Sequence, residues 1–426
     1  MLSPYEINLF IYNIVVLPVI FLSMVYYFMV LLNFGIKIPR LRFRNKIKKW
    51  PFVTIQLPVY NDPVVGRCIK TCLNLDYPKD RYEIVVADDS TDEKTKKIID
   101  SFKGKIKIVR RNNRKGFKAG ALNNAMKYSK GEIIVVFDSD WVPPKNFLKR
   151  IVKPFLADDK IAGVQGRIKV INKDLNLVTK FASALLLAYY RIWVPLQHKA
   201  GATYLGGTAM ALRRDVLEEV GGWNENSLTE DADLTVNLLK RGYKILYMGD
   251  LKAGGEVPYN LFHFLKQQAR WAYGQARVFV EHWRDILFSK TFNIKQKLII
   301  FLTSIGGNLI APFVVLMTLT GQLGWVLGPM KPFELQDFYR FVFYFVATGG
   351  FLAVLGFTLK KENLTKDFPS VFFGAMTIGV LLAITNSIAA MRALLGMKMV
   401  WFKTPKWGDF SVLKIFKVLF SRNGGK

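Results

Sequence analysis

An uncharged apolar stretch, residues 7–34, lies near the start of the chain and limits the folds available to it. A segment of this length can cross a bilayer hydrocarbon core of about 30 Å. A cleaved signal peptide would begin with basic residues and have a shorter apolar core, whereas residues 1–6 contain no Lys or Arg. The sequence therefore predicts a retained N-terminal transmembrane anchor, residues 1–36.

Three further apolar blocks, at about 298–327, 338–359 and 368–396, lie in the last part of the chain. Each is close to or above the length needed to span a bilayer. We therefore expect about three transmembrane helices within residues 298–400, followed by a basic tail at 401–426.

Basic residues follow the anchor at once, and by the positive-inside rule they place the chain from about residue 37 onward in the cytoplasm, at the cell membrane. Three C-terminal spans would then put the basic tail outside, against the same rule, and the sequence does not settle this conflict. Arg392, in the last block, would cost about 2.5–3.5 kcal/mol at a bilayer centre, so it is expected to face protein or a polar path. The basic run after the anchor consists of Lys37, Arg40, Arg42, Arg44, Lys46, Lys48 and Lys49.

The composition agrees with a membrane protein, because the chain is 51% hydrophobic and yet carries a net charge of +29. Soluble proteins rarely combine these properties, whereas a membrane protein with a basic cytoplasmic face does. Contact with membrane lipids is expected. Nucleic-acid binding is not expected, since no zinc-finger spacing or basic low-complexity tail accompanies the charge. The two cysteines, Cys68 and Cys72, indicate a reducing compartment without a disulfide framework.

Between the anchor and the later apolar blocks, apolar strand patterns alternate with helical segments, which predicts an α/β domain with a mostly parallel sheet. No Gly-x-Gly-x-x-Gly fingerprint follows a strand and no Walker-type loop is present, so dinucleotide oxidoreductases and P-loop NTPases are not expected. The strands are predicted at 52–57, 82–87, 105–110, 132–137 and 161–171, and the helices at 63–74, 92–102, 118–129 and 145–157.

The fourth predicted strand ends in two aspartates, Asp138 and Asp140. Side chains alternate along an extended chain, so the two carboxylates are expected on one side, about 7 Å apart along the backbone. Carboxylates at the carboxyl end of a buried strand can share a hard divalent cation, and this edge of an α/β sheet is where ligands bind. Taken alone, the same pattern is also typical of a solvated turn.

Two other predicted strands end in polar groups. The first strand closes in a turn that carries Tyr60 and Asp62, and the second ends at Asp88. The carboxylate of Asp88 can accept hydrogen bonds from a nucleobase or a ribose. Its neighbours can serve simply as helix caps.

Two predicted helix starts also carry charged groups. Lys118 lies in a glycine-containing helix start that suits an anionic ligand, although an ordinary helix start has the same pattern. Glu230 and Asp231 open another predicted helix, where acidic residues are favoured by the helix dipole alone. A carboxylate at this position can also act as a general base toward a hydroxyl group.

A long amphipathic segment, placed at residues 258–297, carries Gln267, Arg270 and Trp271 on one helical face. An amide, a guanidinium and a large ring can hold a diphosphate and stack on a sugar. A plain interfacial helix would also bury the tryptophan at the headgroups. Residues 176–198 are predicted to form an interfacial helix as well, with packing in the core as the alternative.

Several small-residue motifs accompany these sites. Taken together and in order, four of the sites described above resemble the motifs of the family 2 glycosyltransferases, in particular the membrane-integrated cellulose, hyaluronan and mannan synthases. These sites are Asp88, Asp138-Ser139-Asp140, Thr229-Glu230-Asp231 and Gln267-x-x-Arg270-Trp271. The resemblance covers about residues 52–285 and looks closest to the plant β-mannan and glucomannan synthase-like branch and its prokaryotic relatives. It implies a GT-A-type catalytic domain, assigned here to residues 37–257. The additional motifs are Lys118-Ala119-Gly120-Ala121-Leu122-Asn123, Gly206-Gly207-Thr208-Ala209, Gly221-Gly222-Trp223, Gly249-Asp250-Leu251-Lys252 and Lys403-Thr404-Pro405-Lys406.

The resemblance also implies roles in binding a nucleotide-sugar donor. Asp88 would contact the nucleoside, with Tyr60 and Asp62 nearby. Lys118 would reach the nucleotide or its phosphate. Asp62 stands where many members of the family carry Glu, which is a departure from the pattern.

The remaining implied roles concern the metal ion and the reaction. Asp138 and Asp140 would bind Mg²⁺ or Mn²⁺ together with the donor diphosphate, Asp140 more directly. Asp231, positioned by Glu230, would be the catalytic base. The residues implied to hold the diphosphate and the acceptor sugar are Gln267, Arg270 and Trp271.

The expected function is that of an inverting, metal-dependent and processive glycan synthase that builds a β-linked polysaccharide from GDP-mannose, UDP-glucose or UDP-N-acetylglucosamine. One alternative is the addition of a single sugar to a lipid acceptor. A second, from another class, is a nucleotide-binding membrane transporter or scaffold. Cellulose itself is not expected, because Gln165-Gly166-Arg167 stands where cellulose synthases have Gln-Thr-Pro-His.

Overall fold

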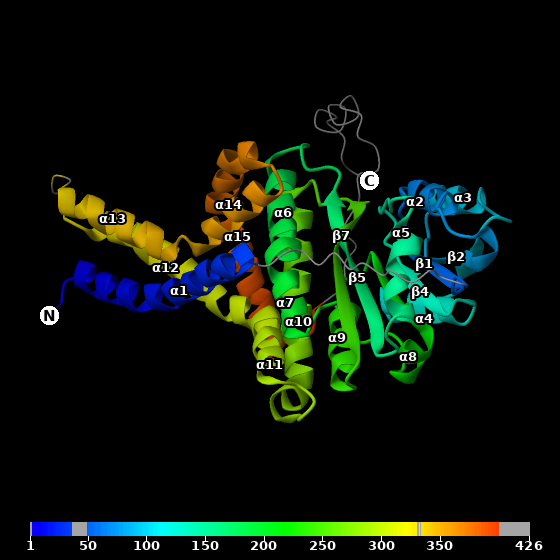
Figure 1. Cartoon of the computed structure of the whole chain (residues 1–426). Helices are drawn as coiled ribbons and strands as arrows, with labels where there is room; N and C mark the ends of the chain where they lie inside the picture. Colours follow the sequence, from blue (N-terminus) through cyan, green and yellow to red (C-terminus); the bar gives the residue numbers. More distant parts are fainter. Residues whose placement is uncertain (1, 36–48, 330–331, 333, 400–426) are drawn as a thin grey trace.

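The computed structural model describes residues 2–35, 49–329, 332 and 334–399. The basic run from Lys37 to Lys48 and the predicted tail at 401–426, with its Lys403–Lys406 motif, lie outside the described residues. Within the described part, a mixed sheet with helices on both faces is joined to a set of long apolar helices (Figure 1).

The sheet has seven strands in the order β3-β2-β1-β4-β6-β5-β7. Only β6 runs antiparallel to its neighbours β4 and β5, and every other pairing is parallel. The predicted mostly parallel sheet and its five predicted strands are therefore confirmed, whereas β6 and β7 were not predicted. The strands are β1 Val53–Val59, β2 Tyr82–Asp88, β3 Lys107–Arg110, β4 Ile133–Val136, β5 Ile161–Val170, β6 Met210–Arg213 and β7 Lys244–Gly255.

Strand β4 shows why the centre of the sheet is so apolar. Ile133 and Val135 pack into the hydrophobic core on one face, and Ile134 and Val136 pack into the core on the other. Because side chains alternate along a strand, burial on both faces requires a continuous run of apolar residues. The helices that accompany the sheet are α2 Val65–Leu73, α3 Glu93–Asp100, α4 Phe117–Met126, α5 Phe147–Ile151, α8 Arg214–Glu219 and α9 Glu230–Lys240, with 3₁₀ turns at Lys79–Arg81 and Lys153–Leu156.

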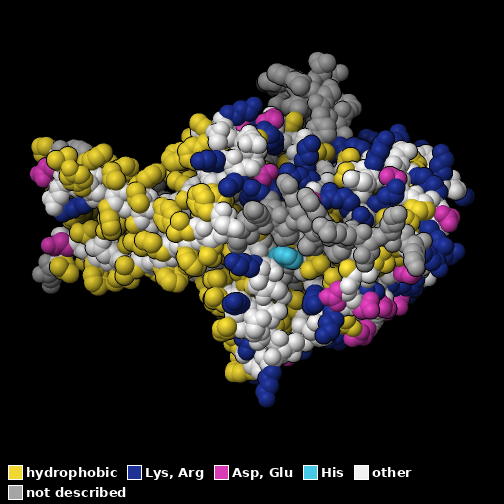
Figure 2. Space-filling model, in the orientation of Figure 1, with side chains coloured by type: hydrophobic (Ala, Val, Ile, Leu, Met, Phe, Trp, Pro, Cys, Tyr) yellow, Lys and Arg dark blue, Asp and Glu magenta, His cyan; other side chains and the backbone are white. Residues whose placement is uncertain are grey.

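The remaining helices form the apolar part of the molecule. Helices α1, α12 and α13 pack together and project away from the sheet as an arm whose surface is largely hydrophobic (Figures 1 and 2). These helices are α1 Pro4–Gly35, α6 Leu177–Ala188, α7 Val194–Ala200, α10 Leu261–Phe288, α11 Ile294–Phe301, α12 Gly307–Leu327, α13 Leu335–Thr348, α14 Gly350–Lys361 and α15 Phe368–Leu394, with π-helical turns at Tyr189–Trp193 and Leu302–Gly306 and a 3₁₀ turn at Thr365–Asp367.

Four helical segments of the described chain are long and apolar enough to cross a membrane: Pro4–Gly35, Leu177–Ala200, Ile294–Leu327 and Thr365–Leu394. The predicted anchor and the first and last of the three C-terminal blocks are among them. Leu177–Ala200, predicted as interfacial, contains α6 and α7, and α6 packs against α14 and α15.

The middle block consists of two helices, α13 and α14, which meet at an angle of 63° and together are long and apolar enough for one broken span or a re-entrant loop. Gly350 lies at this bend, and its backbone N–H donates a hydrogen bond to Ser23 Oγ (2.7 Å). A Cβ atom there would lie 2.2 Å from the backbone oxygen of Ser23, so the close approach of α1 requires glycine. Arg392 lies within the candidate span Thr365–Leu394, in the last turn of α15, and donates to the backbone oxygen of Lys398 (2.9 Å).

Candidate active site

A cavity of about 500 Å³ lies between the carboxyl ends of the strands and the long helices. Nine of the eleven predicted site residues line it, although they come from five separate stretches of the chain. These nine are Tyr60, Asp62, Lys118, Asp138, Glu230, Asp231, Gln267, Arg270 and Trp271.

The two aspartates after β4 are not arranged as an extended strand would place them. The strand ends at Val136, and a turn follows in which the N–H of Trp141 donates to the backbone oxygen of Asp138 (3.1 Å). Asp138 faces the cavity, whereas Asp140 is fully buried and accepts a hydrogen bond from the N–H of Glu256 (2.9 Å). The prediction of an extended chain through these two residues is therefore wrong, because a turn follows the end of the strand at Val136.

Lys118, in the first turn of α4, connects the aspartate loop to α9. Its ammonium group lies 2.9 Å from Asp138 Oδ1 and 3.4 Å from Glu230 Oε1, and it donates to the backbone oxygen of Gly207 (2.8 Å). Burial lowers the pKa of Lys118, but the carboxylates of Asp138, Glu230 and Asp231 outweigh this effect and raise it. Lys118 therefore stays charged and forms ion pairs with two carboxylates, those of Asp138 and Glu230.

Asp231 lies in the first turn of α9, next to Gly207. A Cβ atom at Gly207, whose φ is +72°, would lie 3.0 Å from Asp231 Oδ2, so glycine lets the 206–208 loop approach the carboxylate. Burial and the neighbouring charge of Glu230 raise the pKa of Asp231 to about 7, although Lys118 acts in the opposite direction. A carboxylate with such a pKa is suited to accept a proton near neutral pH.

Helix α10 brings the predicted face of Gln267, Arg270 and Trp271 to the cavity. Arg270 Nη1 donates to the backbone oxygen of Leu228 (3.0 Å), immediately before the stretch that carries Glu230 and Asp231. This contact fixes the guanidinium beside the acidic end of α9.

A tight contact keeps α10 against this end of α9. Gly274 faces Thr229, and a Cβ atom on it would lie 2.3 Å from Thr229 Cγ2, a separation that real atoms do not tolerate. The motif residues on α10 and the carboxylates on α9 therefore keep their spacing only if residue 274 is glycine.

Substituting Gly274→Ala is expected to destabilise the protein by about 1–3 kcal/mol and to reduce turnover, because the added methyl group must push α10 away from Thr229. Thermal unfolding of the purified protein and kcat measure the two effects. Gly379→Ala, on α15, is the matched control, since its Cβ atom would make only ordinary contacts, the nearest at 3.7 Å. A wild-type melting temperature for Gly274→Ala would contradict this account.

Of the three residues predicted to contact the nucleoside, two line the cavity and one does not. The ring of Tyr60 lines the cavity, with the guanidinium of Arg114 stacked 3.3 Å from its centroid. Asp62 accepts a hydrogen bond from Ser139 Oγ (2.6 Å), which ties this turn to the aspartate loop. Asp88 is buried and is not part of the cavity wall. Its carboxylate pairs instead with Arg110 Nε (2.8 Å).

Residues 51–274 match the family model described as "Glycosyltransferase like family 2". The chain belongs to this family. A probable glucomannan 4-β-mannosyltransferase 7 from Oryza sativa subsp. japonica is 34% identical over 264 residues, covering 58% of this chain and 45% of the relative. Glucomannan 4-β-mannosyltransferase 9 from Arabidopsis thaliana is 35% identical over 263 residues, covering 58% of this chain and 49% of the relative.

A bacterial relative, the probable glycosyltransferase YdaM of Bacillus subtilis (strain 168), is 30% identical over 270 residues, covering 61% of this chain and 62% of the relative. The chain spans about half the length of the two plant relatives. Among solved structures, the mannosyltransferase PcManGT from Pyrobaculum calidifontis, in complex with GDP-Man and Mn²⁺, superposes with a TM-score of 0.65 at 19% identity, over 91% of this chain and 99% of that one. The likeness shows a GT-A-type fold joined to apolar helices. Because the chain belongs to a transferase family, the alternative prediction of a nucleotide-binding transporter or scaffold is wrong.

The aspartate loop of this family 2 glycosyltransferase carries two carboxylates that could hold a metal ion. Asp138 and Asp140 supply carboxylate oxygens, the ligands that Mg²⁺ and Mn²⁺ prefer. Within the described residues, no group of three or more His, Cys, Asp and Glu side chains could hold a cation by itself. Glu256, which also lines the cavity, is paired with Arg67 Nη2 (2.7 Å). The donor set therefore fits a cation that takes its other ligands from a bound diphosphate.

The sequence reasoning missed several residues of the cavity wall. Asp89 lines the cavity where Asp88 was expected, and Arg111 holds it through two hydrogen bonds (2.7 and 2.6 Å). Side chains alternate along a strand, and this alternation could have indicated that the neighbouring Asp88 and Asp89 point to opposite sides. The apolar helices also contribute wall residues that no local pattern marked: Tyr26, Trp193, Thr303, Asn308 and Asn386.

Proposed function

We propose that this protein is an inverting, metal-dependent hexosyltransferase that uses a nucleotide sugar to build a β-linked polysaccharide at the membrane, with its catalytic domain on the cytoplasmic side. The observation that carries the proposal is the single cavity that joins Asp138, Asp231 and Trp271 and continues among the apolar helices. A donor at the sheet edge and an acceptor at the membrane would then meet at one point.

In the proposed reaction, Asp231 takes the proton from an acceptor hydroxyl while that oxygen forms a bond to the anomeric carbon of the donor. The bond from this carbon to the diphosphate breaks at the same time, so an α-linked donor yields a β-linkage and a nucleoside diphosphate leaves. Arg270 would stabilise the developing negative charge on the leaving group. Lys118 would keep Glu230 and Asp138 in place.

Asp138 and Asp140 would hold a divalent cation, Mg²⁺ or Mn²⁺. When bound, this ion supplies positive charge to the departing diphosphate. The proposed donor is GDP-mannose, because the plant relatives at 34–35% identity are named mannosyltransferases. UDP-glucose and UDP-N-acetylglucosamine are the other candidates. Nucleotide release from each donor, with and without Mn²⁺, tests this choice, and a donor preference for a uridine nucleotide would overturn it.

Activity is expected to rise with pH through about 7, because Asp231 accepts a proton only when ionised and its pKa is raised to about 7. Two substitutions should move this limb of the kcat/KM profile in opposite directions. Lys118→Met removes a cation that lowers the pKa of Asp231, so the limb should shift to higher pH. Glu230→Gln removes a charge that raises it, so the limb should shift to lower pH. A profile that keeps its midpoint in both variants would exclude Asp231 as the titrating base.

A second candidate function is the addition of one sugar to a lipid acceptor. It is favoured by the small number of candidate spans, four in the described chain plus one bent pair, and by the entry of Tyr26, Asn308 and Asn386 into the cavity wall. Sizing the product made by the purified protein from a radiolabelled donor separates the two. Long chains support the synthase, and a singly glycosylated lipid as sole product would replace it by the second candidate.

A further inference from the structure

Three cationic side chains converge on one carboxylate where the sheet meets the apolar helices. Glu362, which follows α14, has its Oε1 atom 2.6 Å from Arg167 Nη2 and 3.8 Å from Arg191 Nε, and its Oε2 atom 3.8 Å from Lys252 Nζ. The side chain of Arg167 is only 2% exposed and that of Glu362 is 11% exposed. The cluster therefore holds three positive charges against one negative charge. Arg167 and Glu362 are shielded from water, whereas the side chain of Lys252 is 46% exposed and lies at the edge of the cluster.

The pairing of the strands produces this excess of positive charge. In the parallel register of β5 and β7, Arg167 stands opposite Lys252. Like charges directly opposite each other on neighbouring strands are destabilising, and a buried cation without a partner is more so. Burial, together with the charge of Arg167, lowers the pKa of Lys252. In addition, the buried Nε of Arg167 has no hydrogen-bond acceptor among the described residues.

The nearby carboxylates of the described chain do not correct the imbalance. Asp367 is already engaged by Lys173 (3.1 Å) and Lys180 (3.6 Å). Among the described residues, the cluster thus keeps an excess of positive charge.

The position of the cluster indicates where the anion comes from. Glu362 follows α14, which packs on α1 and α6 beside the hydrophobic arm. Lys and Arg side chains gather next to the apolar surface in this region (Figure 2). The headgroups of a membrane crossed by the arm would lie at this level, and anionic headgroups attract basic clusters there.

We propose that Arg167, Arg191 and Lys252 form a phosphate-binding site, separate from the active-site cavity, that takes the phosphate of an anionic phospholipid headgroup. Guanidinium groups suit this ligand because their N–H groups match two phosphate oxygens at once. Glu362 occupies part of the site and ties α14 to the sheet. A bound phosphate would compensate the remaining positive charge and tighten the same junction.

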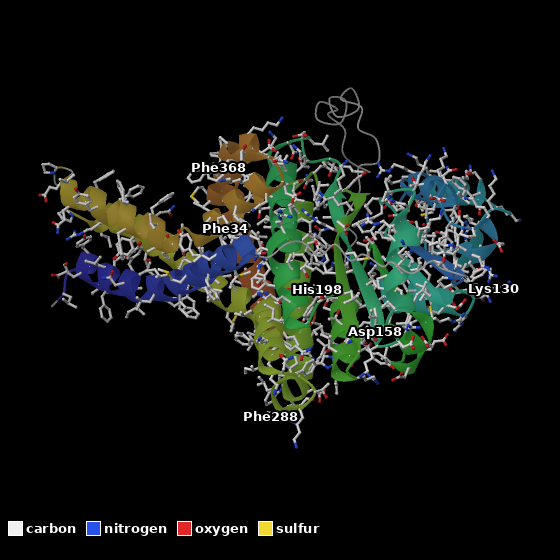
Figure 3. The ribbon with its side chains drawn as sticks, viewed as in Figure 1. Phe34, Lys130, Asp158, His198, Phe288 and Phe368 are labelled. Atoms are coloured by element: carbon white, nitrogen blue, oxygen red, sulfur yellow. The ribbon has the colours of Figure 1, made fainter. Side chains whose placement is uncertain are left out.

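The test measures equilibrium binding to the full-length purified protein at low ionic strength, without nucleotide. The probes are dioctanoyl phosphatidylglycerol, dioctanoyl phosphatidylcholine and inorganic phosphate. Lys252→Gln should weaken phosphatidylglycerol binding about tenfold, because a charge-assisted hydrogen bond is lost. Glu362→Gln should strengthen it, because the competing carboxylate is gone. Lys130→Gln, at the far end of the catalytic domain (Figure 3), should bind as the wild type does.

Opposite effects of Lys252→Gln and Glu362→Gln on phosphatidylglycerol affinity would distinguish a binding site from a purely structural cluster. Tighter binding of phosphatidylglycerol than of inorganic phosphate assigns the site to the lipid, and equal binding with the same response to Lys252→Gln assigns it to free phosphate. The proposal is overturned if phosphatidylcholine binds as tightly as phosphatidylglycerol, or if neither anionic probe distinguishes Lys252→Gln from Glu362→Gln. Arg167→Met provides the same loss of charge should Lys252→Gln fail to fold.

Discussion

Replacing Asp231 by Asn is expected to lower kcat for sugar transfer about 10³-fold while the KM for the donor stays near its wild-type value. The amide keeps the size of the side chain but cannot accept the proton of the acceptor hydroxyl, and general-base catalysis contributes about 10²–10⁴-fold. Asp231 is also not one of the residues that would hold the donor diphosphate, and Lys118 pairs with Asp138 of the aspartate loop. Initial rates of nucleotide release with varied donor give both constants.

Asp233→Asn is the matched control for this substitution. Asp233 lies on the same helix two residues later and is more deeply buried than Asp231, but it contacts His282 Nε2 (2.9 Å) and is not part of the cavity wall. The control should keep most of the wild-type kcat. Comparable losses in both variants would show that the effect comes from α9 as a structural element rather than from its base.

Replacing Asp138 by Asn is expected to reduce kcat/KM about 10²–10³-fold and to abolish the response to added Mn²⁺. The substitution removes a carboxylate from the proposed cation site, and a metal ion at a departing diphosphate is worth several kcal/mol. It also removes the partner that Lys118 contacts at 2.9 Å, so Lys118 should turn toward Glu230.

The measurement combines activity with binding of Mn²⁺ in the presence of the nucleoside diphosphate product. Asp80→Asn serves as the control, because Asp80 is an exposed aspartate on the same domain. Retention of full Mn²⁺-dependent binding by Asp138→Asn would place the cation elsewhere. Loss of activity with binding preserved would instead indicate a role for Asp138 in orienting Lys118.

The sequence was a good guide wherever a local pattern reflects burial. Strand β4 was predictable because its four residues are buried on both faces, and α10 because Gln267, Arg270 and Trp271 follow a helical period. Strand β6 was not, since it is short and takes its antiparallel place from the neighbours β4 and β5 rather than from its own residues. Tertiary pairing of this kind leaves no periodic signal.

Some features of the candidate site could likewise be predicted from the sequence, whereas others could not. Motif residues such as Asp138 and Asp231 could be named in advance, but their geometry depended on a turn after Val136 and on Gly207 in a left-handed conformation. The wall residues Asn308 and Asn386 lie on helices whose sequences read only as apolar. Their role depends on how α12 and α15 pack, which sequence spacing does not encode.

The wall contributed by α15 has a consequence for the biosynthesis of the protein. Asn386 lies on α15, so the cavity is bounded on this side only after this helix has been synthesised. The sheet and its aspartate loop can fold much earlier, because domains generally fold as units while the chain emerges. Sugar transfer would then begin only once α15 has been inserted, and we expect a chain that ends before α15 to be inactive.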